Sequence, residues 1–229
     1  MSELRWNPVL QEWVITATQR QDRTFLPPAD YCPLCPTRPG SDFPTEVPRP
    51  DYEIVAFENK FPSLRAEPPA PAVAPGELYQ VAPAQGICEV ILYTPEHGGT
   101  LADRSVEEID RLIQVWTDRY LELGALDFVK YVLIFENKGQ VIGVTLTHPH
   151  GQLYAFPFIP PKLQRELDAA RAHRERTGGC LFCDLVAEEL KDGRRIVWQN
   201  DCWLAVIPFF ARWPYEIHLL TKSSAPSSR

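Results

Sequence analysis

The run His148-Pro149-His150-Gly151-Gln152 constrains this chain more than any other feature. Proline fixes its own φ and pushes the preceding residue towards extended geometry, so the two histidines sit on a stiff backbone. Strand-like residues precede the run at 141–146 and follow it at 153–158. Imidazoles at a strand end can act as nucleophiles or metal ligands near neutral pH, and Gly151 would admit a ligand close to the backbone. The alternative is a polar turn with two solvated histidines, since short motifs give false positives.

Composition limits the classes of protein that the chain can belong to. Its 229 residues can form one large or two small domains with a substantial core. The net charge of −7 argues against a general nucleic-acid binder, although it leaves room for a local basic pocket. Residues 1–13 lack the apolar core of a signal peptide, and no stretch approaches the ~18 apolar residues of a membrane span. We therefore expect a cytoplasmic protein.

The six cysteines are not expected to form disulfides in that compartment. Cys32 and Cys35 have the spacing of zinc ligands, and the proline-rich flank argues against a redox pair there. Cys180 and Cys183 repeat the spacing, and whether they bind metal stays open. The two remaining cysteines are expected to be inert fillers, as buried free thiols usually are: Cys88 and Cys202.

A tetrahedral zinc site needs two ligands beyond the first cysteine pair. His148 is available, and His97 follows a predicted strand, although a histidine in a turn is usually solvated. If His148 binds the metal, His150 is left as the nucleophile. Its second ring N–H then needs an acceptor, for which a nearby backbone carbonyl would serve. Gln152 would donate an amide N–H to a developing phosphoryl charge, and attack on an α-phosphorus would give a nucleotidyl-histidine and ping-pong exchange.

Hydrophobic patterning predicts strands and helices of an α+β fold. A helix is expected from the capping-box pair Ser105 and Glu108 to Gly124, and a second over 161–176. The proline-rich stretch 61–83 reads as a surface connection. Strands are expected at 12–16, 52–57, 87–94, 129–135, 195–198, 203–207 and 216–220.

The second Cys-x-x-Cys pair and the strands after it are a weak echo of the first half of the chain. We expect a catalytic domain at 1–177, an incomplete second repeat at 178–221 and a disordered tail at 222–229.

Several motifs together resemble the galactose-1-phosphate uridylyltransferase family of the histidine-triad superfamily, over most of the chain. The matching segments are Arg5-Trp6-Asn7-Pro8, Trp13-Val14, Cys32-x-x-Cys35, Glu58-Asn59-Lys60-Phe61-Pro62, Tyr93-Thr94-Pro95-Glu96-His97, Phe135-Glu136-Asn137-Lys138-Gly139, His148-Pro149-His150-Gly151-Gln152, Trp203-Leu204-Ala205-Val206 and Trp213-Pro214-Tyr215-Glu216. The resemblance implies a histidine-triad-like fold, an antiparallel sheet with flanking helices, followed by a truncated second copy.

The resemblance also implies a reaction, a step of galactose metabolism that moves UMP from UDP-glucose to galactose 1-phosphate through a uridylyl-histidine. By this resemblance His150 is the nucleophile and Gln152 steadies the transferred group. The implied zinc ligands are Cys32, Cys35, His97 and His148.

Further residues acquire roles only through the resemblance. Asn59 and Phe61 match the uridine site. Arg20 and Arg23 match basic residues near the phosphates that would reach across a dimer interface. Glu166 matches a ligand of a second metal, often iron, although an exposed helix glutamate is the favoured interpretation. Three positions match residues that line the phosphates: Asn137, Gly143 and Thr145.

The nature of the fifth motif residue separates the alternatives. Histidine-triad hydrolases usually carry a third histidine where Gln152 stands, and glutamine cannot donate a proton to a leaving group as an acid, which favours transfer over hydrolysis. The alternative enzyme is a phosphorylase or nucleotidyltransferase for another sugar nucleotide, such as ADP-glucose. The alternative of another class is a non-catalytic, zinc-stabilised nucleotide-binding remnant. A homodimer, or a separate chain that supplies the C-terminal half, is the expected partner.

Overall fold

The computed structural model describes residues 2–17, 31–40, 44–142, 144 and 146–223. The chain divides into two compact units, and the boundary in the sequence falls between Pro160 and Pro161. The boundary expected from the sequence, at 177/178, lies 17 residues further along the chain than this one. The difference is helix α2 (Pro161–Thr177), which belongs to unit 2 because it packs against the next helix. That the second unit is an incomplete repeat stays a prediction.

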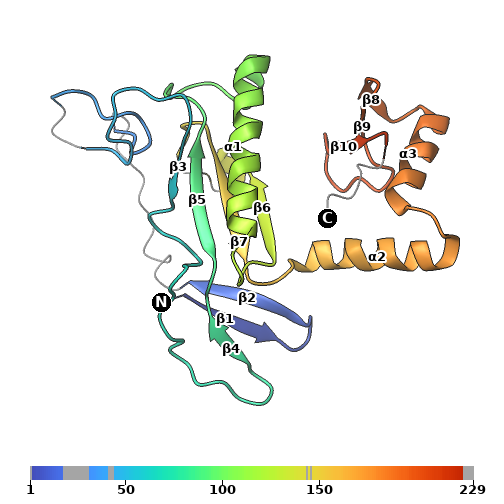
Figure 1. Cartoon of the computed structure of the whole chain (residues 1–229), viewed down its shortest axis with the longest axis horizontal. Coiled ribbons are helices and arrows are strands. Elements are labelled where there is room, and N and C mark those ends of the chain that lie inside the picture. The colour runs from blue at the N-terminus through green and yellow to red at the C-terminus, as the bar shows by residue number, and fades with distance from the viewer. Residues whose placement is uncertain (1, 18–30, 41–43, 143, 145, 224–229) are drawn as a thin grey trace. The chain divides into compact units, whose positions relative to one another are not determined.

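A four-stranded antiparallel sheet forms the centre of unit 1 (Figure 1). Its order is β3 (Val55–Glu58), β5 (Ile87–Leu92), β7 (His150–Phe156) and β6 (Tyr131–Phe135). Each of these strands was expected from the sequence, with boundaries that differ by a few residues.

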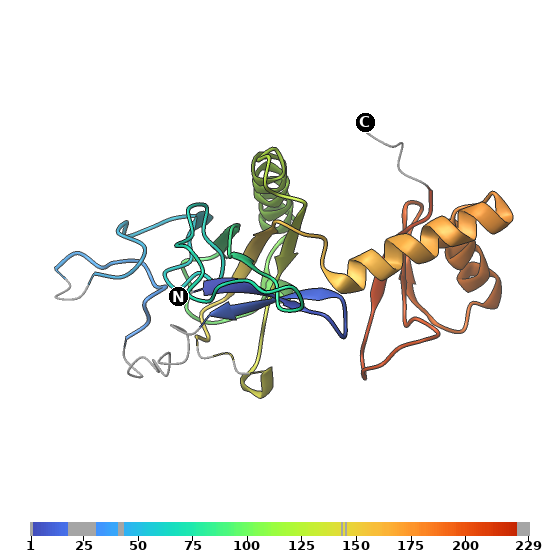
Figure 2. The same ribbon diagram turned by 90° about the horizontal axis from the view of Figure 1, so that it is seen from below.

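Helix α1 (Val106–Gly124) covers one face of this sheet, as the view from below shows (Figure 2). Its capping box is formed as predicted: the Ser105 hydroxyl accepts from the Glu108 N–H, and the Glu108 carboxylate accepts from the Ser105 N–H. Alternate side chains of the sheet, among them Ile91 and Leu153, pack with Leu112 of the helix in the main core. The intervening side chains of β5 and β7 therefore face the other side, where the candidate site lies.

A smaller sheet of order β2 (Glu12–Ala17), β1 (Ser2–Asn7) and β4 (Val81–Pro83) flanks the first. β4 lies at the end of the stretch expected to be a connection. Among the described strands it pairs with β1 alone, so it is an edge strand, and an edge strand can accommodate a proline. Cys88 is buried in the core that includes Leu4 of this sheet and Leu64, as expected of a filler, while its inertness stays a prediction. Cys202 is exposed instead, in the turn where its N–H donates to Asn200.

The strand expected at 141–146 is wrong for the residues that the structure describes. Gln140–Ile142 forms a single turn of 3-10 helix, and Val141 is fully exposed. Gly139 precedes it with φ of +101°, a left-handed conformation that turns the chain away from a continuing strand. The histidine motif therefore stands at the start of one strand, β7, and not between two.

Unit 2 consists of α2, α3 (Leu181–Asp192) and a three-stranded sheet of order β10 (His218–Thr221), β9 (Trp203–Val206) and β8 (Ile196–Gln199). Val186 of α3 packs against Leu204 and Val206 in a core of its own. α3 was not predicted, although Gly193 at its C-terminus, with φ of +73°, is a usual helix stop. The expected tail falls mostly at 224–229, outside the described residues.

Candidate functional site

A loop that carries the first cysteine pair lies on the face of the sheet opposite α1. Leu34 and Val47 of this loop are buried against Val90 and Leu92 of β5. The Thr37 hydroxyl donates to the Val47 carbonyl at 2.8 Å and closes the loop. The apolar anchor fixes the cysteines beside the end of the sheet.

The cysteine pair meets two histidines there. The sulfur or nitrogen atoms of four residues lie within 4.8 Å of one another: Cys32, Cys35, His97 and His148. Cys35 Sγ is 3.4 Å from His97 Nδ1 and 3.5 Å from His148 Nδ1. Zinc–sulfur and zinc–nitrogen bonds of ordinary length at a tetrahedral angle place sulfur and nitrogen about 3.6 Å apart. The four side chains thus fit a tetrahedral metal ion, which is the set that the resemblance implied.

Hydrogen bonds to the outer ring nitrogens fix both imidazoles in the orientation that such an ion requires. His148 Nε2 lies 3.0 Å from the Thr94 carbonyl, and His97 Nε2 lies 3.1 Å from Thr147 Oγ1. A carbonyl only accepts, so His148 carries its proton on Nε2 and leaves the Nδ1 lone pair facing Cys35. Partners of this kind orient metal-bound histidines in proteins.

A second layer holds the Thr94 carbonyl itself. The Tyr52 hydroxyl donates to it at 2.6 Å and lies 3.2 Å from His148 Nε2. Arg104 Nη1 donates to Thr94 Oγ1 at 3.3 Å, and its Nη2 binds the Glu96 carboxylate at 3.1 Å. None of these supporting contacts was predicted, because each depends on segments that the folded sheet brings together.

Burial shifts the protonation equilibria of the group. His148 is 1% exposed, and burial lowers its pKa, which keeps the imidazole neutral and able to ligate. Burial, followed by the neighbouring Cys32 sulfur, raises the pKa of the Cys35 thiol to about 11. Metal binding must therefore displace a proton from sulfur, and the apparent affinity rises with pH.

His150 is directed differently from His148. Its Nδ1 lies 2.7 Å from the backbone carbonyl of His148, the kind of acceptor that we expected. Because that carbonyl accepts a hydrogen bond from Nδ1–H, the lone pair of the neutral ring is on Nε2. His150 is the first residue of β7 and pairs with Leu92 of β5, so the sheet fixes its backbone.

Two depressions of the surface share His150. One is a cavity of about 190 Å³ whose lining includes Asn59, Phe61 and Gln152. The other, of about 350 Å³, includes Asn137 and the two other histidines of the site. Asn59, Phe61, Asn137 and Gln152 thus line depressions that share one imidazole, that of His150.

Individual side chains near His150 are well fixed. Asn59 is 7% exposed. Its side-chain Oδ1 accepts a hydrogen bond from the Phe61 backbone N–H at 2.9 Å, and its backbone N–H donates to the Cys88 carbonyl at 2.8 Å. Gln152 shares the face of His150, since side chains alternate along a strand. Gly151 falls on the opposite face for the same reason, so its missing side chain does not open the site to a ligand.

Some candidates lie elsewhere or outside the described residues. Glu166 of α2 is 3.9 Å from Lys162, an i,i+4 surface pair, and no metal-ligand group within the described ranges includes it. Cys180 and Cys183 are likewise outside the four-residue group. Four predicted substrate-binding residues lie outside the described residues and stay predictions: Arg20, Arg23, Gly143 and Thr145. None of the described helices is long and apolar enough to span a bilayer.

Comparison with known proteins gives consistent matches for both units. Residues 1–160 match the N-terminal domain of galactose-1-phosphate uridyl transferase, and residues 166–228 match its C-terminal domain. The galactose-1-phosphate uridylyltransferase of Thermotoga maritima is 38% identical over 97% of this chain and 67% of its own length. That of Streptomyces lividans is 40% identical over 98% of this chain and 58% of its own length. A solved uridylyltransferase superposes with a TM-score of 0.81 at 32% identity, covering 96% of this chain and 66% of its own. The chain therefore spans about two thirds or less of the length of these relatives.

Proposed function

The chain belongs to the galactose-1-phosphate uridylyltransferase family, and on that premise we propose that it transfers UMP from UDP-glucose to a hexose 1-phosphate, with His150 as the nucleophile. The observation that carries the proposal is the 2.7 Å contact between His150 Nδ1 and the His148 carbonyl. It fixes the tautomer in which Nε2 can attack, at the point where two depressions meet.

The first half-reaction follows from that geometry. Nε2 attacks the α-phosphorus, a nitrogen–phosphorus bond forms, and the bond from phosphorus to the bridging oxygen breaks. Glucose 1-phosphate leaves with that oxygen and both bonding electrons. The ring keeps its Nδ1–H and becomes cationic, and the His148 carbonyl stabilises this charge through the hydrogen bond already in place.

The second half-reaction reverses the first with another acceptor. A phosphate oxygen of the hexose 1-phosphate attacks the same phosphorus, and Nε2 departs with the bonding electrons as a neutral imidazole. Gln152 donates its amide N–H to a phosphoryl oxygen in both steps. The leaving group in the first step is a phosphate with a low pKa, which needs no general acid, in keeping with a glutamine at this position.

We assign the cavity lined by Asn59 and Phe61 to the uridine and the depression lined by Asn137 to the phosphates and the sugar. Four residues outside the described part of the chain belong to the same proposal: Arg20, Arg23, Gly143 and Thr145. This division is supported by the lining of the two depressions that share His150, since Asn59 lines one and Asn137 the other.

Zinc is the metal that the four-residue group would hold, because two thiolates and two imidazoles are a common structural zinc set. Four protein ligands leave no open position for substrate, so the ion would act by fixing the strand end. His148 is the link: its ring belongs to the group and its carbonyl orients His150. The free state of all six cysteines is compatible with a reducing compartment, so we place the protein in the cytoplasm. We also propose that it forms a homodimer there, which sedimentation equilibrium would test.

The test is covalent labelling with UDP-glucose that carries its label in the α-phosphate. We expect acid-labile, base-stable label on His150, lost in His150→Gly while the zinc content stays unchanged. His218→Gln is the matched histidine control, because His218 pairs with Glu216 and is not part of the group. A zinc-loaded chain that takes no label from UDP-glucose would overturn the proposal, and label taken only from ADP-glucose would support the alternative enzyme.

A further inference from the structure

The second Cys-x-x-Cys pair stands at the start of α3 in unit 2. Cys180 is the residue that precedes the first turn of the helix, and Cys183 is in that turn. Both are exposed. A pair of this spacing at a helix N-terminus places two thiols at the positively polarised end of the helix dipole.

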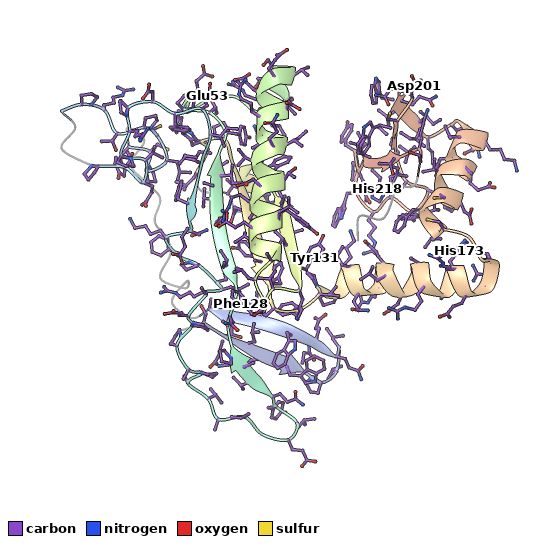
Figure 3. All side chains as sticks on the ribbon, viewed as in Figure 1. Glu53, Phe128, Tyr131, His173, Asp201 and His218 are labelled. Carbon is purple, nitrogen blue, oxygen red and sulfur yellow. The ribbon has the colours of Figure 1, made fainter. Side chains whose placement is uncertain are left out.

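The two cysteine pairs of the chain differ in their surroundings. Two imidazoles complete the first pair, whereas no group of three or more candidate ligands in the described ranges contains Cys180 or Cys183. His173, near the end of α2 (Figure 3), is paired with the residue that follows Cys183: its Nε2 lies 2.6 Å from the Asp184 carboxylate. Among the described residues, the second pair therefore has no histidine or carboxylate grouped with it as a metal ligand, and its two cysteines are exposed thiols three residues apart.

We propose that Cys180 and Cys183 form a reversible intrachain disulfide by exchange with a low-molecular-weight disulfide such as oxidised glutathione.

The local backbone allows the two sulfurs to meet. Side chains three residues apart on a helix have Cβ atoms about 5–6 Å apart, and a disulfide brings them to about 4 Å. Cys180 is extended, with φ of −98° and ψ of 120°, and makes no side-chain capping bond of good geometry. Gly178, with φ of +76° and open space around it, precedes the pair and can absorb a small rotation. The ion pair between His173 and Asp184 meanwhile holds the first turn, so Cys180 is the residue that moves.

The two thiols are not equivalent in reactivity. The Cys183 backbone N–H and then the Cys183 thiol lower the pKa of Cys180. The contact with Cys180 raises the pKa of Cys183. Cys180 is therefore the attacking thiolate and Cys183 the resolving thiol, while the nearby Asp184 charge opposes ionisation of both.

The exchange proceeds in two balanced steps. The Cys180 thiolate attacks one sulfur of oxidised glutathione, a mixed disulfide forms, and one glutathione thiolate leaves and takes up the proton. The Cys183 thiol then loses its proton and attacks the Cys180 sulfur, which releases the second glutathione. The two cysteines lose two electrons and two protons, and one glutathione disulfide becomes two thiols.

Peptide mapping of the full chain tests the proposal directly. Trypsin cleaves after Arg176 and Lys191 and releases both cysteines in one peptide. After equilibration with oxidised glutathione and alkylation of free thiols under denaturing conditions, we expect this peptide to be two hydrogens lighter than the dithiol and unalkylated. Excess reduced glutathione should restore the dithiol.

Single variants distinguish the proposal from nonspecific oxidation. Cys183→Ser should accumulate glutathione on Cys180, and Cys180→Ser should take up at least ten times less. Cys202→Ser is the control, because Cys202 is an exposed cysteine with no neighbouring partner of this spacing, and it should leave the internal disulfide unchanged. A pair that stays reduced while Cys202 is glutathionylated would overturn the proposal, as would a second equivalent of zinc lost on Cys180→Ser.

Discussion

Tyr52→Phe should weaken metal binding without disturbing any ligand. The change removes one hydroxyl, which donates to the Thr94 carbonyl at 2.6 Å and lies 3.2 Å from His148 Nε2. His148 keeps its direct 3.0 Å contact with that carbonyl, so the imidazole loses only part of its support.

The expected size of the effect follows from those contacts. A net hydrogen bond between neutral groups contributes about 1 kcal/mol, and loss of an outer partner of a metal-bound histidine costs roughly 10–100-fold in affinity. Because one partner remains, we expect the low end, a loss of about 10-fold or ~1.4 kcal/mol in zinc binding. The assay is competition for zinc against a chromophoric chelator at fixed pH.

Tyr93→Phe is the matched control for this measurement. Tyr93 is buried and its hydroxyl, like that of Tyr52, donates to an acceptor, but the acceptor is the Glu136 carboxylate, which is not part of the metal group. Its zinc affinity should stay within about twofold of the parent, a difference of ~0.4 kcal/mol. Equal losses in both variants, or no loss in Tyr52→Phe, would refute the role assigned to the Tyr52 hydroxyl.

Three further predictions concern stability, each measured as the free energy of unfolding in urea. Gly86→Ala should lose about 2–4 kcal/mol, because the added Cβ would lie 2.5 Å from the Ala155 carbonyl oxygen and φ is +150° at this position. Gly76→Ala is the control, because open space surrounds Gly76 and little change is expected. Equal urea midpoints for the two variants would contradict this prediction. Ser105→Ala should lose about 1 kcal/mol through the cap of α1, and a loss below a few tenths would be inconsistent with it. Hydrogen bonds from Arg5 and the Ala72 N–H lower the pKa of Glu3, so its contribution to the free energy of unfolding is present above the unfolded pKa of roughly 4.3 and disappears as pH falls through the lower folded value. Glu3→Gln should therefore reduce the loss of stability between neutral and acid pH, and an unchanged loss would refute this role.

Local sequence signals predicted most elements of the fold, and long-range geometry accounts for the rest. The capping box of Ser105 and the apolar stripe behind it are contained within one helix, so the sequence could show them. α3 was missed because Cys180 at its N-terminus makes no side-chain capping bond, so the usual sequence signal of a helix start is absent. The turn at Gln140–Ile142 was misread as strand because two β-branched residues are exposed there, where packing cannot enforce the conformation that they prefer.

The same division holds for the site. Motif spacing could identify Cys32, Cys35 and the two motif histidines, while His97 needed the family resemblance. Tyr52 carries no signal at all, because its contact with Thr94 joins residues 42 positions apart. The supporting contacts are therefore properties of the folded loop and sheet, and only a structure can supply them.

His148 explains why the proposed metal group and the proposed nucleophile lie only two residues apart in the sequence. A metal ligand needs a fixed ring, and a nucleophile needs a fixed tautomer, which is a hydrogen-bonding requirement. His148 meets both needs. Its ring belongs to the proposed metal group and is only 1% exposed, and its carbonyl accepts a hydrogen bond from His150 Nδ1–H at 2.7 Å. Proline between them restricts the backbone through which the two are joined. Rigidity supplied by the group therefore reaches His150 over a few covalent bonds and one hydrogen bond. A structural metal site can thus serve catalysis without touching the substrate.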